Sequence, residues 1–207
     1  MKLQISYDLP SLQQALEIAK ITASYADILE IGTSLLFANG IESIKAFCNQ
    51  FPDKPIMVDA KVIIHSHITI PLFISAGAQY ISVLAGATNA SIKHATTLAH
   101  ASGAKIVLDL LDSVSPGQSA VDAKILEVDT ILFHRNYEAK SKEDVSELWQ
   151  EVRENTSLPI FIEGGIDRSN IDSVLNLKPQ GVIIGYGIIK ADNPVTEAAY
   201  FKELLNR

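Results

Sequence analysis

Acidic and basic side chains of this sequence cluster where short apolar runs end. Asp59 and Lys61 follow the run at 55–58, and Glu30 lies in the run at 27–31. Residues two apart in an extended strand point to the same side, so Asp59 and Lys61 can reach one ligand. Two carboxylates with open coordination positions suit Mg²⁺. The pattern predicts a magnesium site on Glu30 and Asp59, with a purely structural ion-paired cluster as the alternative.

Three further ionisable side chains occupy equivalent positions in other runs. His134 follows the run at 130–133 and is the only histidine at such a place. An imidazole there is suited to proton transfer near neutral pH, although a structural histidine is the alternative. Asp8 follows the run at 2–7, and Asp109 lies near the end of the run at 105–110. An unpaired buried charge is costly, so charged residues at these places indicate a functional site.

Glycines follow the last two apolar runs and predict phosphate-binding loops. They are Gly164, Gly165, Gly185 and Gly187. Small residues let backbone N–H groups approach an anion, while simple tight turns are the alternative. Glu163 beside the first pair, and the lack of arginine or lysine in either loop, count against phosphate.

The elements that must hold these side chains alternate regularly. Strand-like runs occupy 2–7, 27–31, 55–58, 80–84, 105–110, 130–133, 158–162 and 181–184. Helical patterns occupy 11–25, 41–51, 68–76, 90–101, 119–127, 142–154, 168–175 and 194–205. Strict alternation favours parallel strands, and eight units favour a single (β/α)8 TIM barrel spanning residues 1–207. An open doubly wound sheet is the alternative. In a barrel, the strand ends named above share the catalytic rim.

Composition excludes several classes of function. The 207 residues are 47% hydrophobic and carry 17 Lys and Arg against 24 Asp and Glu, a formal charge of −7. An acidic chain without a basic cluster is a poor nucleic-acid binder. The single cysteine, Cys48, cannot form an intrachain disulfide, which favours the cytoplasm. No apolar run approaches about 18 residues and the first residues lack a signal-peptide pattern, so no membrane association is expected.

The sequence resembles a known enzyme group, the hexulose-6-phosphate synthases and 3-keto-L-gulonate-6-phosphate decarboxylases of the orotidine-monophosphate-decarboxylase superfamily. The residues that carry the resemblance are Glu30-Ile31-Gly32-Thr33, Asp59-x-Lys61, His134 and the late glycines. The resemblance covers essentially the whole chain. It implies a (β/α)8 homodimer with active sites at the subunit interface, Mg²⁺ and a sugar-phosphate substrate. The implied intermediate is a metal-stabilised cis-enediolate, which the synthase adds to formaldehyde and the decarboxylase makes by losing CO₂.

The resemblance also implies a role for each candidate residue. Glu30 and Asp59 would bind Mg²⁺, Lys61 would neutralise the enediolate oxygen, and His134 would move the proton. Asp8 and Asp109 would hold substrate hydroxyls, and Gly164, Gly165, Gly185 and Gly187 would present N–H groups to the phosphate. A divalent cation and an ammonium at a developing enediolate are strong transition-state stabilisers.

Four positions depart from the pattern of that group. Its motif is Asp-x-Lys-x-x-Asp, and Ile64 stands at the last aspartate, which in the group crosses into the partner's site. Tyr137 and Tyr186 stand where the decarboxylase has arginines, and Glu163 replaces a small neutral residue. These departures favour the synthase branch over the decarboxylase branch and leave room for a diverged member. His65, next to Ile64, is a candidate replacement for the missing aspartate.

Three functions from different classes follow. The first is a Mg²⁺-dependent carbon–carbon lyase on a ketose phosphate, with ribulose 5-phosphate and formaldehyde as the preferred substrates. The second, motivated by Ile64, is a sugar-phosphate binder with weak or no activity. The third is an epimerase-like isomerase with Asp8 and Asp109 as acid and base, which the Asp59–Lys61 cluster fits poorly. An apolar patch at Ile63, Ile64 and Ile68 predicts a dimer contact near the third strand.

Overall fold

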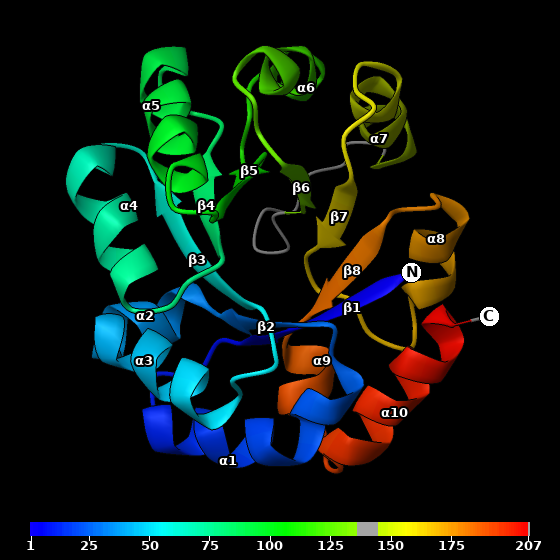
Figure 1. Cartoon of the computed structure of the whole chain (residues 1–207). Coiled ribbons are helices and arrows are strands. Elements are labelled where there is room, and N and C mark those ends of the chain that lie inside the picture. Colours follow the sequence, from blue (N-terminus) through cyan, green and yellow to red (C-terminus); the bar gives the residue numbers. More distant parts are fainter. Residues whose placement is uncertain (136–144, 207) are drawn as a thin grey trace.

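The strands form a closed parallel barrel in the computed structural model, which describes residues 1–135 and 145–206. Eight strands in these ranges pair in chain order, and β1 pairs with β8 to close the ring. They are β1 (Lys2–Tyr7), β2 (Ile28–Ile31), β3 (Ile56–Val62), β4 (Tyr80–Leu84), β5 (Lys105–Asp109), β6 (Thr130–His134), β7 (Ile160–Glu163) and β8 (Gly181–Ile184). The (β/α)8 TIM barrel expected from the alternation is confirmed (Figure 1).

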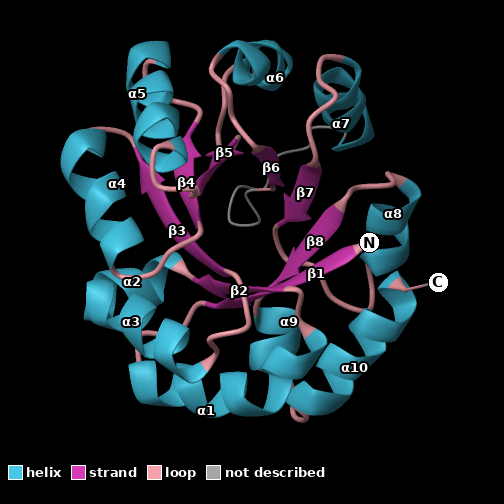
Figure 2. Ribbon diagram, viewed as in Figure 1, coloured by secondary structure: helices cyan, strands magenta, loops and turns pink. Residues whose placement is uncertain are grey.

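Helices surround the strands on the outside of the ring (Figure 2). They are α1 (Leu12–Thr22), α2 (Thr33–Asn39), α3 (Ile41–Gln50), α4 (Ser66–Ser75), α5 (Asn89–His100), α6 (Pro116–Ile125), α7 (Val145–Glu154), α8 (Ile171–Asn176), α9 (Tyr186–Ile189) and α10 (Pro194–Leu205). A 3₁₀ turn at Ala23–Tyr25 extends α1. No helix within 1–135 or 145–206 combines the length and apolar character needed to cross a bilayer.

Helix α1 shows why the local sequence adopts this structure. Ser11 precedes it in an extended conformation, and its hydroxyl accepts a hydrogen bond from the backbone N–H of Gln14, at 3.3 Å. Such a cap satisfies one of the free donors of the first turn. Ala15 and Ala19 are fully buried, one helical turn apart. The small side chains let the helix lie close to the barrel.

The side chains inside the barrel form two layers with opposite character. The lower layer is apolar and consists of Ile28, Met57, Val107, Leu132, Phe161 and Ile183. Residues two positions further along the same strands face the same interior, because side chains alternate across a strand. In β2, β3 and β5 these are Glu30, Asp59 and Asp109. The strand period therefore places a charged layer directly above an apolar floor.

Most observed boundaries lie within three residues of the expected ones, and the larger differences concern β3, α2 and α9. Strand β3 extends to Val62, four residues beyond the expected end, with a shift of register against β4 between Val58 and Val62. Lys61 has a φ of 45°, so this end of the strand is irregular. Helices α2 and α9 were not expected from the sequence, and positions 142–144 of the expected seventh helix lie outside the described residues.

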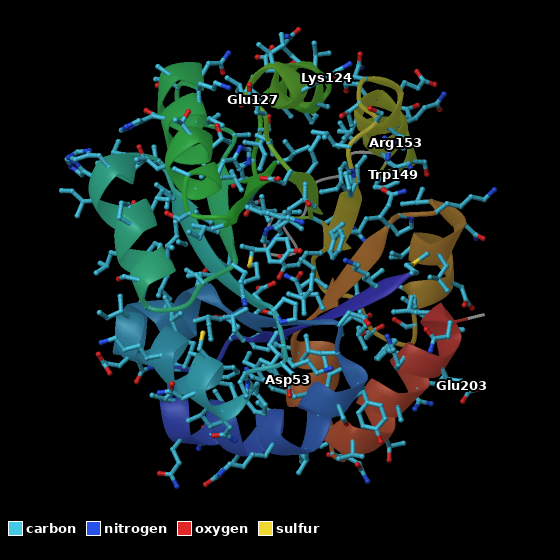
Figure 3. The ribbon with its side chains drawn as sticks, in the orientation of Figure 1. Asp53, Lys124, Glu127, Trp149, Arg153 and Glu203 are labelled. Atoms are coloured by element: carbon cyan, nitrogen blue, oxygen red, sulfur yellow. The ribbon has the colours of Figure 1, made fainter. Side chains whose placement is uncertain are left out.

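Helix α7 packs against the barrel through Trp149, which Figure 3 labels on this helix. Trp149 is 6% exposed, and its ring contacts Phe133 of β6 edge-on, with 5.5 Å between ring centroids. Aromatic rings favour this edge-to-face arrangement. The contact fixes α7 beside the strand that carries His134.

Candidate active site

Polar side chains fill the upper interior of the barrel. Those with at most 4% exposure are Gln4, Ser6, Glu30, Asp59, Ser82 and Asp109. A buried polar group that makes no hydrogen bond destabilises the fold, so such groups are nearly always hydrogen-bonded. All six have hydrogen-bond partners, whereas Glu163 at the end of β7, which is less buried, has a carboxyl oxygen with none in the described ranges.

Glu30 lies deepest in this cluster and is fully buried. Ser6 Oγ donates a hydrogen bond to Glu30 Oε1 at 2.6 Å, and Gln4 Nε2 donates one to Oε2 at 2.5 Å. Burial and the charge of Asp59 raise the pKa of Glu30 to about 7, despite these hydrogen bonds. The carboxylate lacks a full counter-charge, and a bound cation would supply it.

Lys61 is paired with two carboxylates from different strands. Its Nζ contacts Asp59 Oδ2 and lies 3.3 Å from Asp109 Oδ2. Although burial acts to lower it, these two carboxylates raise the pKa of Lys61 above its ordinary value. Ser82 Oγ donates to Asp59 Oδ1 at 2.9 Å and accepts from the Lys61 backbone N–H at 2.8 Å. The β3 bulge and Ser82 together hold the ammonium over the strand ends.

His134 lies between two carboxylates at the ends of β5 and β7. Its Nδ1 is 3.3 Å from Asp109 Oδ2 and 3.7 Å from Glu163 Oε2. Burial acts to raise the pKa of Asp109, but His134 and Lys61 hold it below its usual value. Burial and the charges of Glu30 and Asp59 raise the pKa of Glu163 well above its usual value. Asp109 is therefore held ionised, while Glu163 resists ionisation.

The donor set fits a hard divalent cation. Among the described residues, the carboxyl groups of Glu30, Asp59, Asp109 and Glu163 share one ammonium group, that of Lys61, and the imidazole of His134 lies beside Asp109 and Glu163. No three His, Cys, Asp or Glu side chains in the described ranges already form a ligand cage. Mg²⁺ is commonly held by one or two carboxylates, with substrate and water at its other positions. The excess negative charge and oxygen-only donors suit such a site.

A cavity of about 610 Å³ opens above the cluster. The sequence-derived candidates that line it are Asp8, Asp59, Lys61, His134, Gly164, Gly165, Gly185 and Gly187. Glu30 and Asp109 do not line it, because both side chains are fully buried. The structure thus brings the candidates together at one end of the barrel.

The glycines after β7 and β8 are required by close backbone contacts. A Cβ atom at Gly164, where φ is 116°, would lie 2.3 Å from the carbonyl oxygen of Arg135. One at Gly187 would lie 2.4 Å from the carbonyl oxygen of Ile166. Only glycine allows the two loops to pack in this way. Close packing of the backbone is therefore enough to explain these glycines. The two loops also border the cavity.

Strong cationic anchors are absent from the described lining of the cavity at these loops. Tyr186 lines the cavity, and Lys190 Nζ lies 3.7 Å from the centre of its ring. Arg168 is held elsewhere by Glu197, at 2.8 Å. A phosphate group at the loops would therefore depend mainly on backbone N–H groups.

Asp8 has a structural role in addition to lining the cavity. Its Oδ1 accepts a hydrogen bond from the Ser34 backbone N–H at 2.7 Å, which caps the start of α2. A Cβ at Gly32 would lie 2.6 Å from Asp8 Cβ, so this contact requires glycine. Thr33, the first residue of α2, donates to Asp59 Oδ2 at 2.7 Å.

Sequence reasoning missed the contributions of Thr33, Ser82 and Glu163 as site residues. From the sequence, Glu163 is a rim residue, an obstacle to phosphate and a departure from the family pattern, with no role in the site, although it lies two positions after the interior residue Phe161. The two-residue strand period was a sufficient signal for Glu163. The hydrogen bonds of Thr33 and Ser82 depend on the barrel geometry and have no sequence signal.

The departures from the enzyme pattern lie partly outside this cavity. Ile64 is 64% exposed beyond β3 and does not line the cavity of its own chain. His65 is exposed too, with a φ of 57° and its ring beside that of His67. Tyr137 lies outside the described residues.

Known proteins resemble this chain over its full length. A family model described as "Orotidine 5'-phosphate decarboxylase / HUMPS family" matches residues 1–201. A 3-hexulose-6-phosphate synthase of Bacillus subtilis is 30% identical over 207 residues, covering 99% of each chain. The crystal structure of a 3-hexulose-6-phosphate synthase from Salmonella typhimurium superposes with a TM-score of 0.93 at 26% identity, covering 100% of this chain and 99% of that one. A 3-keto-L-gulonate-6-phosphate decarboxylase from Vibrio cholerae gives a TM-score of 0.85 at 25% identity, covering 100% and 97%. The chain belongs to the orotidine 5'-phosphate decarboxylase / HUMPS family, in the group that includes these synthases and decarboxylases.

Proposed function

We propose that this protein is a carbon–carbon lyase of the 3-hexulose-6-phosphate synthase type, acting on ribulose 5-phosphate and formaldehyde. The observation that carries the proposal is the cluster in which Lys61 and His134 stand over Asp59 and Asp109 at the cavity floor. An ammonium and an imidazole beside a bound ketose suit the formation of an enediolate. The names of the full-length relatives support the same reaction type.

The substrate lies along the cavity in this proposal. Backbone N–H groups of the β7 and β8 loops bind the phosphate, and Asp8 binds a hydroxyl. Asp109, expected from the sequence to bind a hydroxyl as well, does not line the cavity and instead holds Lys61 and His134. Lys61 Nζ stabilises the negative oxygen of the enediolate, since its ammonium is already held in place by two carboxylates. His134 exchanges the proton at the reacting carbon.

Glu30 and Asp59 would hold Mg²⁺ in the active form of this enzyme. The chemistry that the ion would supply when bound is positive charge that stabilises an enediolate. Ser6, Gln4 and Ser82 orient the two carboxylates through the hydrogen bonds described above. Calorimetric titration of Mg²⁺ into wild type and Asp59→Ala tests the site, and equal binding to both would contradict it.

We also propose that the enzyme is a cytoplasmic homodimer. The exposed residues Ile63, Ile64 and Ile68 form a patch at the β3–α4 corner, and such patches usually mark contacts. The single cysteine supports a reducing compartment.

A direct assay tests the proposed reaction. Formaldehyde consumption with ribulose 5-phosphate and Mg²⁺ is expected, and it is expected to fall at least a hundredfold in Asp59→Ala. In parallel, CO₂ release from 3-keto-L-gulonate 6-phosphate tests the decarboxylase reaction. Binding of ribulose 5-phosphate without either reaction would instead establish the sugar-phosphate binder that Ile64 motivates.

A further inference from the structure

Glu163 lines the proposed substrate cavity and carries one buried carboxyl oxygen that makes no hydrogen bond within the described residues. The side chain is 17% exposed, and the buried oxygen is Oε2. A buried carboxyl group without a partner is destabilising and calls for an explanation. The other carboxylates of the cluster that have been described, at Glu30, Asp59 and Asp109, all accept hydrogen bonds.

We propose that Glu163 is the catalytic acid of this site and works as a pair with His134. The inference rests on the proposed function and adds a residue to it. His134 and Glu163 are directly opposite each other on β6 and β7, and His134 Nδ1 lies 3.7 Å from Glu163 Oε2. The two groups face the same cavity and are close enough to exchange a proton after a small movement.

The charges around Glu163 suit a proton donor. Glu30, Asp59 and Asp109 bring negative charge to it from β2, β3 and β5, while Lys61 brings positive charge. The net effect, together with burial, is a raised pKa for Glu163 beside a lowered pKa for Asp109. Two carboxyl groups whose environments separate their pKa values in this way can act as a neutral acid and an ionised anchor.

The proposed cycle balances its protons. His134 takes the proton from C1 of the ketose, and the electrons of that C–H bond become the enediolate. The enediolate carbon forms a bond to the carbon of formaldehyde, whose C=O π electrons move to oxygen. That alkoxide oxygen takes the proton of Glu163. Transfer of a proton from His134 to Glu163 then restores both groups.

This assignment supplies from the same chain the carboxyl group that position 64 lacks. Ile64 cannot donate a proton, and neither it nor His65 lines the cavity of its own chain. Glu163 therefore compensates from β7 for what the loop after β3 has lost.

Glu163→Gln separates the acid step from the base step. The amide keeps the size of the side chain but cannot donate a proton as an acid. Deuterium exchange at C1 of ribulose 5-phosphate, followed by NMR, reports the action of His134 without formaldehyde. We expect exchange and the Kd for ribulose 5-phosphate to stay within threefold of wild type, while condensation falls at least a hundredfold. We also expect the alkaline limb of the condensation pH profile to disappear.

Two further variants complete the test. Glu42→Gln removes an exposed carboxylate on α3 that pairs only with Lys45 in the described ranges, and is expected to match wild type. Glu163→Asp keeps an acid at shorter reach and is expected to condense at least ten times faster than Glu163→Gln. If Glu163→Gln does not fold, as judged by circular dichroism, Glu163→Ala takes its place, and condensation at the wild-type rate in that variant would overturn the assignment.

The possible failures are distinguishable. If wild type condenses and Glu163→Gln condenses equally well, the assignment of Glu163 is wrong and the proposed function stands. If exchange and condensation fall together in Glu163→Gln, Glu163 is not a separate acid and the assignment is wrong. If wild type neither exchanges nor condenses, the proposed function fails and this inference fails with it.

Discussion

Lys61 illustrates how single residues hold this site together. Its ammonium is the common partner of Asp59 and Asp109, which come from different strands and are almost fully buried. Without it, two buried carboxylates would lie close together with only His134 to compensate. Removing one partner from a buried charge pair is far more costly than removing an exposed pair.

Lys61→Ala is therefore expected to destabilise the fold as well as abolish turnover. We expect the free energy of unfolding in urea to fall by about 3 kcal/mol, because the remaining carboxylates lose their counter-charge. Lys45→Ala, which breaks an exposed pair with Glu42, is the control and is expected to change it by less than about 0.5 kcal/mol. Equal losses in the two variants would show that Lys61 has no special structural role.

Residue types at strand ends were sufficient to locate Asp59, Lys61 and His134 in one place. Asp59 and Lys61 lie close together, as the sequence predicts, but the regular strand assumed in that prediction is not what joins them. A bulge with a positive φ at Lys61 takes its place. It could not show that Glu163 Oε2 would lack a partner, since this depends on where every neighbouring donor points.

At the scale of elements, the loops after β7 and β8 form one unit. Gly187 approaches the carbonyl oxygen of Ile166, and Gly164 approaches that of Arg135. The wall of the cavity thus depends on backbone contacts between three consecutive strand ends. A side chain at either glycine would push the wall apart.

Gly164→Ala is expected to lose both stability and ligand affinity. The new Cβ would meet the Arg135 carbonyl oxygen at 2.3 Å, in addition to the strain of a φ of 116°. Gly103→Ala is a matched control, because Gly103 has a φ of 74° but no atom within 4 Å of the new Cβ. We expect calorimetry to show at least tenfold weaker binding of ribulose 5-phosphate in Gly164→Ala only. Unchanged affinity would mean that the ligand does not use this wall.

Periodicity predicted the strongly patterned elements and failed for short ones. The helix at Pro194–Leu205 was predicted at its observed bounds, since a proline and a long amphipathic run mark it. Helices α2 and α9 have seven and four residues, too few to show a helical period. They directly follow β2 and β8, where Gly32 and Gly185 precede their first residues.

At the scale of the whole molecule, the apolar corner after β3 is the clearest unexplained surface. Ile63, Ile64 and Ile68 are 46%, 64% and 57% exposed, and Leu72 on the same helix is 41% exposed. Burying this surface against a second copy of the chain would stabilise a dimer by about 25 cal/mol for each Å² of apolar surface removed from water. The missing aspartate at position 64 makes this corner more apolar.

Ile68→Glu is expected to convert the dimer into a monomer, because it places a charge in the contact. Light scattering at micromolar concentration is the measurement. Ile125→Glu is the control, since Ile125 is 71% exposed on α6, away from this corner, and its replacement should leave the mass unchanged. A monomeric wild type would refute the dimer.

The buried carboxyl groups also make the stability of the whole fold depend on pH. Burial raises the pKa of Glu30 from 4.5 to about 7, and that of Glu163 well above its ordinary value. Between about pH 5 and 8 the folded chain therefore holds more protons than the unfolded chain, so the free energy of unfolding falls as pH rises. The lowered pKa of Asp109 acts in the opposite direction, but only at more acidic pH.

We expect Tm to decrease from pH 5 to pH 8, by an amount that corresponds to a loss on the order of 2–3 kcal/mol for Glu30 alone. Glu30→Gln is expected to flatten this dependence, because the amide does not ionise. Mg²⁺ is expected to raise Tm more at pH 8 than at pH 5, since a cation favours the ionised carboxylates. Calorimetric scans at several pH values, with and without Mg²⁺, check all three expectations. A Tm that rises across this interval would contradict the burial of uncompensated acidic groups on which the proposed magnesium site depends.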